Sequence, residues 1–181
     1  DFRAHPPPLD AEVLAGLGDL TGKSVLHLQC HFGMDSIRLK LAGAREVVGI
    51  DFSPVAVAKA RELAAEMAVD VRFLETDLYK LTDVLDGEFD VVFTSYGVTG
   101  WLPDLGPWGQ LIARYLTPGG RFFLIEGHPM LFMFDGSAGR LDFTYPYFRQ
   151  REPIALAPTT GTYADPTATF SSTEYSWPHE L

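Results

Sequence analysis

Asp51 is the residue whose type and spacing most directly indicate chemistry. It ends the apolar segment Glu46–Asp51 and follows Gly33 by eighteen residues. A glycine that opens a helix after one strand, followed about 20 residues later by an acid at the end of the next strand, is typical of nucleotide sites in which the carboxylate binds the ribose hydroxyls. An acid that only caps a helix or faces solvent would give the same pattern. We favour the ribose role and keep the other role as the alternative.

A second acid, Asp77, is in a position to recognise a base. It stands between Thr76 and Leu78, directly after another apolar segment. Its carboxylate could accept a hydrogen bond from an adenine amino group while Leu78 covers the ring. Asp77 could equally cap a turn, because aspartate side chains bond nearby backbone N–H groups. Both interpretations stay open.

The segment around Cys30 combines side-chain types that bind metals. His27, Cys30 and His31 form a His-x-x-Cys-His pattern. Zinc requires four ligands in a closed structural site or three around an open one, and no second Cys/His pair follows at a suitable spacing. Alternation along a strand also directs His27 and Cys30 to opposite faces unless the chain folds back. We therefore expect no metal, and we expect Cys30 to be a small buried apolar residue.

These residues are positioned by a regular series of short apolar runs, each of which stops at Gly, Asp, Ser or Thr. The runs begin near Ser24, Glu46, Val71, Phe89 and Leu116. Such runs are typical of parallel strands that are buried on both faces. Stretches with helical spacing separate them, at Asp35–Ala42, Pro54–Met67 and Trp108–Leu116. The second helix has the clearest start, because Ser53 can cap it and Pro54 suits its first position.

The pattern changes near Pro129, where the helical stretches stop. Short aromatic-rich segments separated by Pro and Gly follow, and these are typical of hairpins, which we expect to be added to the sheet. The segments are Leu141–Phe148, Gly161–Asp165 and Thr173–Trp177. The sequence therefore predicts an α/β core with a ligand site in residues 1–130, and an aromatic-rich hairpin insertion or cap in residues 131–181 that packs on the same domain.

Composition and charge exclude several classes of protein. The 181 residues are 46% hydrophobic and carry a formal net charge of −10, which suits one core and argues against nucleic acid as a partner. No apolar run approaches the roughly 20 residues that span a bilayer, and the first residues show no signal segment. The single cysteine suits a reducing compartment. We expect a cytoplasmic protein that binds neither nucleic acid nor membrane.

Three motifs lie along the predicted strands: VLHLQCHFG from Val25, GIDFSPVAVAKAR from Gly49 and YLTPGGRFFLIE from Tyr115. In this order they resemble the class I S-adenosylmethionine-dependent methyltransferases over about residues 20–129. The LTPGG turn is the sharpest of these signals, because dinucleotide dehydrogenases share the ribose acid but do not typically carry that turn. The resemblance implies a doubly wound, Rossmann-like, mostly parallel α/β sheet ordered 3-2-1-4-5, with the cofactor across the carboxyl ends of strands 1, 2 and 4.

The cofactor implied by the resemblance is S-adenosyl-L-methionine, with S-adenosyl-L-homocysteine as product. Its binding residues would be His27, Gln29, Cys30, His31, Gly33, Asp51, Phe52, Ser53, Thr76, Asp77, Leu78, Ser95 and Tyr96. The first loop resembles a variant found in a poorly characterised bacterial branch of the family.

The first loop departs from the usual family motif VLDLGCGxG at three positions. His27 replaces an acid, while Gln29 and His31 replace glycines. Glycine is needed where φ is positive or where a Cβ would collide, so either this loop has ordinary dihedral angles or the cofactor lies slightly further out. Gln29 and His31 could supply polar contacts that the acid and the backbone supply in relatives.

Methyl transfer from a sulfonium mainly requires that the acceptor be held in line with the sulfur–methyl bond. Tyr96, which ends the fourth run, would face the methyl group and could position an acceptor or cover the adenosine. His128, which follows the fifth run, is the best-placed general base, or else a structural turn residue. We predict these two as the catalytic residues and expect a small-molecule acceptor that is methylated at oxygen or nitrogen.

The nature of the acceptor depends on which aromatic residues line a pocket and which belong to the core. If several line a pocket, the acceptor is apolar, aromatic or cationic. The aromatic residues concerned are Trp101, Trp108, Phe132, Phe134, Tyr145, Tyr147, Phe148 and Trp177. Arg140, Arg149 and Arg151 could instead bind a carboxylate.

Two other functions stay open. One is a nucleotide-cofactor oxidoreductase or epimerase on a related sheet, which is disfavoured because GxGxxG is absent after the first strand. The other is a non-catalytic protein that binds S-adenosylmethionine or another metabolite, as the altered first loop suggests.

The sequence after the hairpins is shorter than the family resemblance leads us to expect. Family members complete the sheet with a helix and two further strands, whereas this chain ends at Leu181, soon after the hairpins. We therefore expect a fragment that lacks the C-terminal strands of the family. The bare edge beside the fifth strand would need cover from a hairpin or from a second copy in a homodimer.

Overall fold

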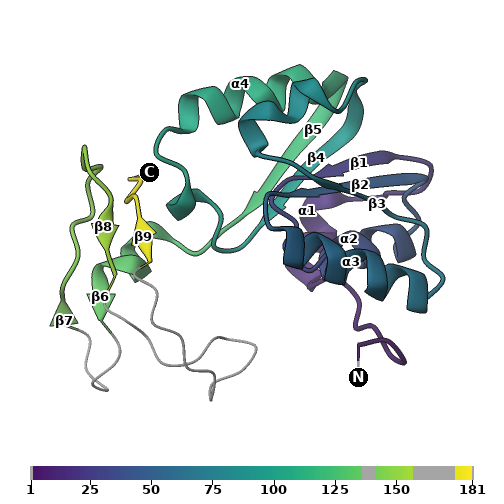
Figure 1. Ribbon diagram of the computed structural model, residues 1–181, viewed down its shortest axis with the longest axis horizontal. Helices are drawn as coiled ribbons and strands as arrows, with labels where there is room; N and C mark the ends of the chain where they lie inside the picture. The colour runs from purple at the N-terminus through teal and green to yellow at the C-terminus, as the bar shows by residue number, and fades with distance from the viewer. Residues whose placement is uncertain (1, 136–141, 157–173, 181) are drawn as a thin grey trace. The chain divides into compact units, whose positions relative to one another are not determined.

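The computed structural model describes residues 2–135, 142–156 and 174–180. The chain forms two compact units. The first comprises Asp1–Ser95 and Gly106–Ile125, and the second comprises Tyr96–Leu105 and the chain from Glu126 onward. Figure 1 labels their helices and strands.

The first unit is built on five parallel strands in the order β3-β2-β1-β4-β5, which confirms the predicted sheet. Apolar β-branched residues on the central strands explain it, because Val25 of β1 is fully buried between Val47 of β2 and Val91 of β4. The strands are β1 Ser24–His27, β2 Glu46–Asp51, β3 Arg72–Glu75, β4 Phe89–Ser95 and β5 Leu116–Ile125.

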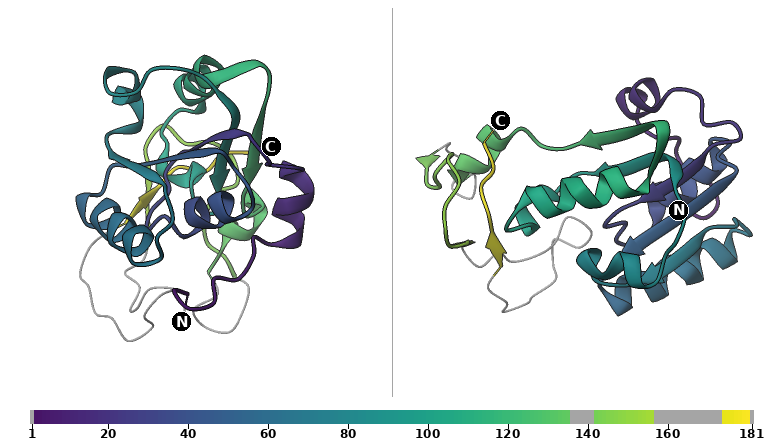
Figure 2. Two further views of the ribbon diagram at one scale, coloured as in Figure 1. Left: turned by 90° about the vertical axis from the view of Figure 1, so that its right-hand side faces the viewer. Right: turned by 90° about the horizontal axis from the view of Figure 1, so that it is seen from above.

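Helices cover the sheet of the first unit, with α2 and α3 on one face and α4 on the other (Figures 1 and 2). The helices are α1 Ala11–Leu17, α2 Met34–Leu41, α3 Pro54–Glu66, the 3₁₀ helix η1 Leu78–Asp83 and α4 Leu105–Tyr115. Helices α2 and α3 agree with the prediction to within one residue, whereas α4 begins three residues earlier than expected. None of the helices in the described ranges is long and apolar enough to cross a membrane.

Helix α1 was not predicted, because it is only seven residues long and shows a single turn of apolar spacing. Its residues Val13 and Leu17 are 3% exposed and join a core cluster with Leu20, Val47 and Phe93. Tertiary packing therefore stabilises a segment whose local pattern is weak.

The LTPGG turn interrupts strand β5. Leu116 pairs with Phe89, but Arg121 pairs with Val91, so four residues of β5 stand opposite the single residue Asp90. Gly120 is required there, because a Cβ at this position would lie 2.9 Å from the carbonyl oxygen of Thr117. The motif is thus an insertion within β5, where the sequence predicted a turn before the strand.

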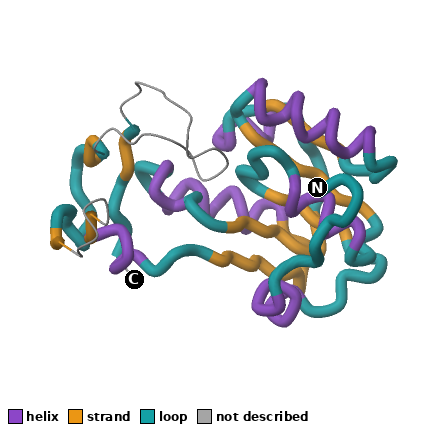
Figure 3. The backbone as a smooth tube through the Cα atoms, turned by 90° about the horizontal axis from the view of Figure 1, so that it is seen from below, coloured by secondary structure: helices purple, strands orange, loops and turns teal. Residues whose placement is uncertain are grey.

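In the second unit the described strands form two small antiparallel sheets, one pairing β6 Phe134–Asp135 with β7 Asp142–Phe143 and the other pairing β8 Ile154–Ala155 with β9 Tyr175–Ser176. The remaining described elements are the 3₁₀ helices η2 Thr99–Trp101 and η3 Pro129–Met133, and Figure 3 distinguishes helices from strands along the described residues. Hairpin-like strands after β5 are thus confirmed.

Our expectation that these strands extend the main sheet was wrong for the described residues. Each strand is two residues long and pairs only within its own sheet. Prolines such as Pro146 and Pro153 interrupt the segments and cannot donate to a longer ladder. The predicted segment Gly161–Asp165 lies outside the described residues.

Candidate functional site

The carboxyl ends of the parallel strands bring the predicted site residues of the first unit to one edge of the sheet. His27 ends β1, Asp51 ends β2 and Ser95 ends β4. The loop after β1 is fixed to both neighbouring strands, because the N–H of Leu28 donates to Phe93 O at 2.9 Å and the N–H of Cys30 donates to Ile50 O at 2.8 Å. Open α/β sheets bind ligands at this edge.

The first loop has the backbone of a glycine-rich loop although two of its glycines are replaced. Gln29, His31 and Gly33 all have positive φ, at +54°, +49° and +71°. The alternative that this loop has ordinary dihedral angles is therefore wrong. Each non-glycine residue in this conformation costs roughly 1–2 kcal/mol, and such strain tends to collect at functional sites.

Gly33 is needed for packing as well as for its dihedral angle. A Cβ at this position would lie 2.5 Å from the ring of Phe73 and 2.8 Å from the Cβ of Ala60. The glycine thus lets the start of α2 approach both β3 and α3. Gly33 belongs to the site as a residue that shapes the loop.

The carboxylate of Asp51 connects the first loop to the end of β2. Its Oδ2 accepts from the N–H of His31 at 2.8 Å, and its Oδ1 accepts from the N–H of Ser53 at 2.9 Å. Asp51 is only 7% exposed, and the cap of α3 is Ser53, whose Oγ accepts from Ala56 N. Asp51 is therefore neither a solvated acid nor the cap of α3. Each of its oxygens keeps acceptor capacity for one hydroxyl group.

The residues around Asp77 have the geometry of a capped turn. Asp77 Oδ1 accepts from the N–H of Tyr79 at 2.9 Å, so Asp77 caps the start of η1. Leu78 is buried, and Thr76 Oγ1 donates to Asp77 O. The capping role is thus realised, and the adenine role stays a prediction. Phe52, next to Asp51, is 76% exposed and offers an aromatic surface at the same edge.

His27 is buried at the end of β1 and differs in charge from the acid that it replaces. Its Nδ1 lies 2.8 Å from Ser36 Oγ, and its Nε2 has no hydrogen-bond partner in the described parts of the chain. Burial lowers the pKa of His27 to about 4, although Asp35 and Asp51 oppose the shift. His27 is therefore neutral at pH 7 and supplies no negative charge.

Cys30 and Gln29 complete the loop. Burial raises the pKa of the Cys30 thiol to about 12, so this residue behaves as the apolar side chain expected and offers no thiolate to a metal. Within the described ranges no three or more His, Cys, Asp or Glu side chains gather as a metal would need. Gln29 Oε1 is hidden from solvent and finds no donor among the described residues.

Asp35, in the first turn of α2, is a site residue that the sequence analysis missed. Its Oδ2 accepts from Ser95 Oγ at 3.1 Å, and its Oδ1 accepts from Arg38 at 2.9 Å. Only its place two residues after Gly33 could have indicated it. It brings a carboxylate to the ends of β1 and β4.

In the second unit, Glu126 organises the loop that follows Tyr96. Its carboxylate accepts from the N–H groups of Gly97, Val98 and Thr99 at 2.6, 2.7 and 3.2 Å, and from that of Gly127 at 2.8 Å. Tyr96 has a φ of +33° and is 54% exposed. The sequence analysis did not identify Glu126, because its partners are backbone groups.

His128 has the geometry of a structural turn residue. Its side chain is exposed, and its Nδ1 accepts from the N–H of Met130 at 3.2 Å, which caps η3. The neutral imidazole has one acceptor nitrogen, and this bond occupies it. His128 does not line the cavity described next.

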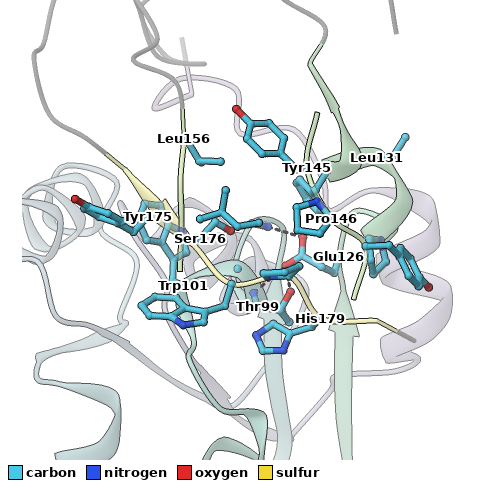
Figure 4. A pocket seen from close by; sticks show the side chains of 18 of the residues that line it. Thr99, Trp101, Glu126, Leu131, Tyr145, Pro146, Leu156, Tyr175, Ser176 and His179 are labelled. Carbon is cyan, nitrogen blue, oxygen red and sulfur yellow. Dashed lines mark hydrogen bonds between the residues drawn. The ribbon is translucent and has the colours of Figure 1, made fainter. Parts of the chain in front are cut away.

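A cavity of about 640 Å³ lies within the second unit (Figure 4). Aromatic side chains dominate its wall, with Glu126 and His179 as polar members. The aromatic residues are Trp101, Phe132, Phe134, Tyr145, Tyr147, Tyr175 and Trp177. Six of these were among the aromatic residues singled out from the sequence.

The other predicted acceptor-site residues lie elsewhere. Trp108 belongs to the core of the first unit, where its ring meets Phe122 edge-on, and Phe148 is 68% exposed. Arg149 donates to Pro103 O at 3.3 Å, and Arg140 lies outside the described residues.

His179 was not identified from the sequence. Its Nε2 lies 2.7 Å from the carbonyl oxygen of Leu102. A carbonyl can only accept, so Nε2 carries the proton and Nδ1 is the acceptor nitrogen of the neutral ring. Any role of the neutral ring as a base would therefore fall to Nδ1.

Comparison with known proteins gives matches in sequence and in structure. A family described as a methyltransferase domain matches residues 25–120. The demethylmenaquinone methyltransferase of Thermus thermophilus is 38% identical over 108 residues, which are 59% of this chain and 48% of that protein. The ribosomal protein L11 methyltransferase of Burkholderia lata is 37% identical over 57% of this chain and 31% of its own length.

A solved structure shows the same fold with a ligand. Magnesium protoporphyrin IX methyltransferase from Synechocystis, crystallised with bound S-adenosylmethionine, is 29% identical, with a TM-score of 0.53 over 62% of this chain and 54% of that chain. This chain spans about half the length of the curated demethylmenaquinone methyltransferases that it matches. Because the matched domain covers more than half of the chain and includes residues of all five strands of the sheet, the chain belongs to the class I S-adenosylmethionine-dependent methyltransferases.

Proposed function

We propose that the protein transfers the methyl group of S-adenosylmethionine to a small-molecule acceptor, at an oxygen or nitrogen atom. The observation that carries this proposal is the first loop. Its backbone keeps positive φ at Gln29, His31 and Gly33, and Asp51 holds it by the N–H of His31. A loop that retains this shape with two strained non-glycine residues is well explained by a ligand that needs the shape.

The residues present at this edge fit the cofactor. The carboxylate of Asp51 would bind the ribose, since each of its oxygens has accepted only one backbone N–H bond. Phe52 would cover the adenine. Thr76, Asp77 and Leu78 would lie beside the base. Ser53 and Ser95 would contact the cofactor at the same edge of the sheet. The unpartnered Oε1 of Gln29 would take a donor from the cofactor. When bound, the cofactor supplies an electrophilic methyl group on a sulfonium.

The cavity of the second unit is the proposed acceptor site. Its aromatic wall suits a planar, apolar ligand that carries a polar group. Glu126 would act as a positioning residue, because its four backbone bonds fix the loop that carries Tyr96, whose ring or hydroxyl would orient the acceptor. On this view residues 131–181 form the cap that recognises the acceptor, and residues 1–130 form the core that binds the cofactor.

An acceptor that arrives protonated would need a general base. Of the two histidines, His179 is favoured over the originally predicted His128, because it lines the cavity and presents Nδ1 as an acceptor. Replacing a general base should lower kcat/KM about 10²–10⁴-fold. His179→Ala should show this loss, and His128→Ala, which removes the cap of η3, should change kcat/KM little.

The proposal for partners and compartment rests on composition. The net charge of −10 makes nucleic acid an unsuitable acceptor, and the single cysteine suits the cytoplasm. Relatives named for a quinone, a porphyrin and a ribosomal protein leave the acceptor class to experiment. A homodimer that covers the outer edge of β5, which pairs only with β4 among the described residues, is part of the proposal.

The proposal is tested with the whole protein that carries this chain, methyl-tritiated S-adenosylmethionine and a panel of phenols, aromatic amines and proteins. We expect the label in an aromatic small molecule and production of S-adenosylhomocysteine. Binding of the cofactor without transfer to any acceptor would instead favour the non-catalytic function. Label only in protein would overturn the small-molecule acceptor.

A further inference from the structure

Asp35 brings a carboxylate to the end of β4, at the edge of the sheet where Asp51 ends β2. Its Oδ2 accepts from the hydroxyl of Ser95, the last residue of β4. Strand β4 is paired with β1, and β1 separates β4 from β2, which ends at Asp51. Two carboxylates therefore stand on either side of the end of β1.

If Asp51 holds the ribose of the cofactor, the site must also bind the methionine arm. The arm carries an ammonium group with three donors, and a buried ammonium needs an opposite charge. If the arm runs from β2 across β1 to β4, it reaches Asp35. The methyl group would then be near the point where the chain leaves β4.

The end of β1 cannot supply this charge. His27 is 2% exposed, and its Nδ1 is bonded to Ser36. Burial lowers its pKa to about 4, so the ring is neutral at pH 7. Gln29 is also neutral and offers only an amide oxygen.

The partners of Asp35 leave room for an ammonium group. Arg38 donates to Oδ1 and Ser95 donates to Oδ2, whereas an ionised carboxylate has about four acceptor positions. Gln29, in the loop between β1 and α2, has a buried Oε1 that finds no donor among the described residues.

We propose that Asp35 binds the ammonium group of the cofactor's methionine arm, with Gln29 Oε1 as the second acceptor. This inference rests on the proposed function, because it assumes that S-adenosylmethionine is bound at this edge. In this chain the negative charge at the site would come from the first turn of α2 and not from the end of β1.

The test is calorimetric binding of two ligands to the whole protein. One is S-adenosylhomocysteine, and the other is its deaminated analogue, which keeps the adenosine and the carboxylate and lacks only the ammonium. The wild type should bind S-adenosylhomocysteine roughly 10- to 100-fold more tightly than the analogue, because hydrogen bonds to charged groups have this strength. In Asp35→Asn the two affinities should become nearly equal.

Asp90→Asn is the matched control. Asp90 is a carboxylate of β4 that accepts from the N–H and Oγ of Ser24, at the opposite end of β1, so its replacement removes a carboxylate from the same unit at a position away from the candidate site. This variant should retain the full preference for S-adenosylhomocysteine. Circular dichroism checks that each variant folds, and Asp35→Ser serves if Asp35→Asn does not.

The outcomes separate the two proposals. If the wild type binds neither ligand, the proposed function fails. If the wild type binds both but Asp35→Asn keeps the preference for the ammonium, the proposed function stands and the role of Asp35 is refuted. A loss of affinity in Asp35→Asn that is equal for both ligands would also refute it, because a merely structural carboxylate would act in that way.

Discussion

Replacing Asp51 by alanine should weaken the protein's stability and its affinity for the cofactor through different bonds. In the free protein the carboxylate accepts from the N–H groups of His31 and Ser53 at 2.8 and 2.9 Å. Asp51 itself is only 7% exposed and both bonds are partly buried, so water would replace the carboxylate only in part. A buried donor left without a partner costs about 1–3 kcal/mol, so for two partly buried donors we expect the free energy of unfolding to fall by about 2 kcal/mol.

The affinity for S-adenosylhomocysteine should fall separately. The bonds from the ribose hydroxyls to a charged acceptor are worth about 1.5–3 kcal/mol, which corresponds to a loss of at least about tenfold. Asp51→Asn keeps one acceptor oxygen for the first loop, so it should be the more stable variant and should still bind less tightly than the wild type.

Comparison with the 2′-deoxy analogue of S-adenosylhomocysteine distinguishes the ribose role from a purely structural one. The wild type should bind the analogue about tenfold more weakly, and Asp51→Asn should discriminate much less, because the coupling between carboxylate and hydroxyl has been removed. Calorimetry at a temperature where both proteins are folded provides the affinities. An undiminished preference for the 2′-hydroxyl in the folded variant would refute the reasoning.

Three further predictions concern other residues. The pKa of His27 is lower in the folded state than its ordinary value of 6.5, so the unfolded chain binds the extra proton first. The free energy of unfolding should therefore fall by up to about 3 kcal/mol as the pH drops from about 6.5 to about 4. Urea unfolding should show a flatter pH dependence in His27→Asn, and a pH dependence identical to that of the wild type would contradict the assignment. Gly33→Ala should lower the stability by about 3 kcal/mol or more, because it combines a positive φ with a collision against Phe73. Gly22→Ala, where φ is +73° but the space around the Cβ is open, should lower it by only about 1–2 kcal/mol. Thermal unfolding measures both losses, and equal losses would show that the collision is relieved. Glu126→Ala should speed amide hydrogen exchange at residues 97–99 and raise the KM for the acceptor. Both effects should be smaller in Glu126→Gln. Unchanged exchange in both variants would show that Glu126 is not the positioning residue.

The strands of the main sheet and the longer helices were predictable because their signals are local, whereas the order of the strands was implied by the resemblance to the methyltransferase family. Ser53 and Pro54 mark the start of α3 in sequence and in structure, and buried valines mark β1, β2 and β4. Helix α1 was missed because its stability comes from packing against the sheet. The small strands of the second unit were expected as hairpins, but their pairing partners could not be derived from aromatic content alone.

The candidate site divides in the same way. Asp51 and Gly33 were recognised from their spacing, which reflects the length of one strand–helix–strand unit. The positive φ of Gln29 and His31 could not be predicted, because these residue types usually avoid that region and only the surrounding contacts impose it. Asp35, Glu126 and His179 depend on contacts between segments that are distant in sequence or on backbone partners, and neither leaves a pattern in the sequence.

The most direct test of the central claim is calorimetric titration of the whole protein with S-adenosylhomocysteine and, separately, with NAD. Because the chain belongs to the methyltransferase family and has no GxGxxG after β1, we predict that one molecule of S-adenosylhomocysteine binds per chain and that NAD does not bind. Saturable binding of NAD, with no heat from S-adenosylhomocysteine, would contradict the account.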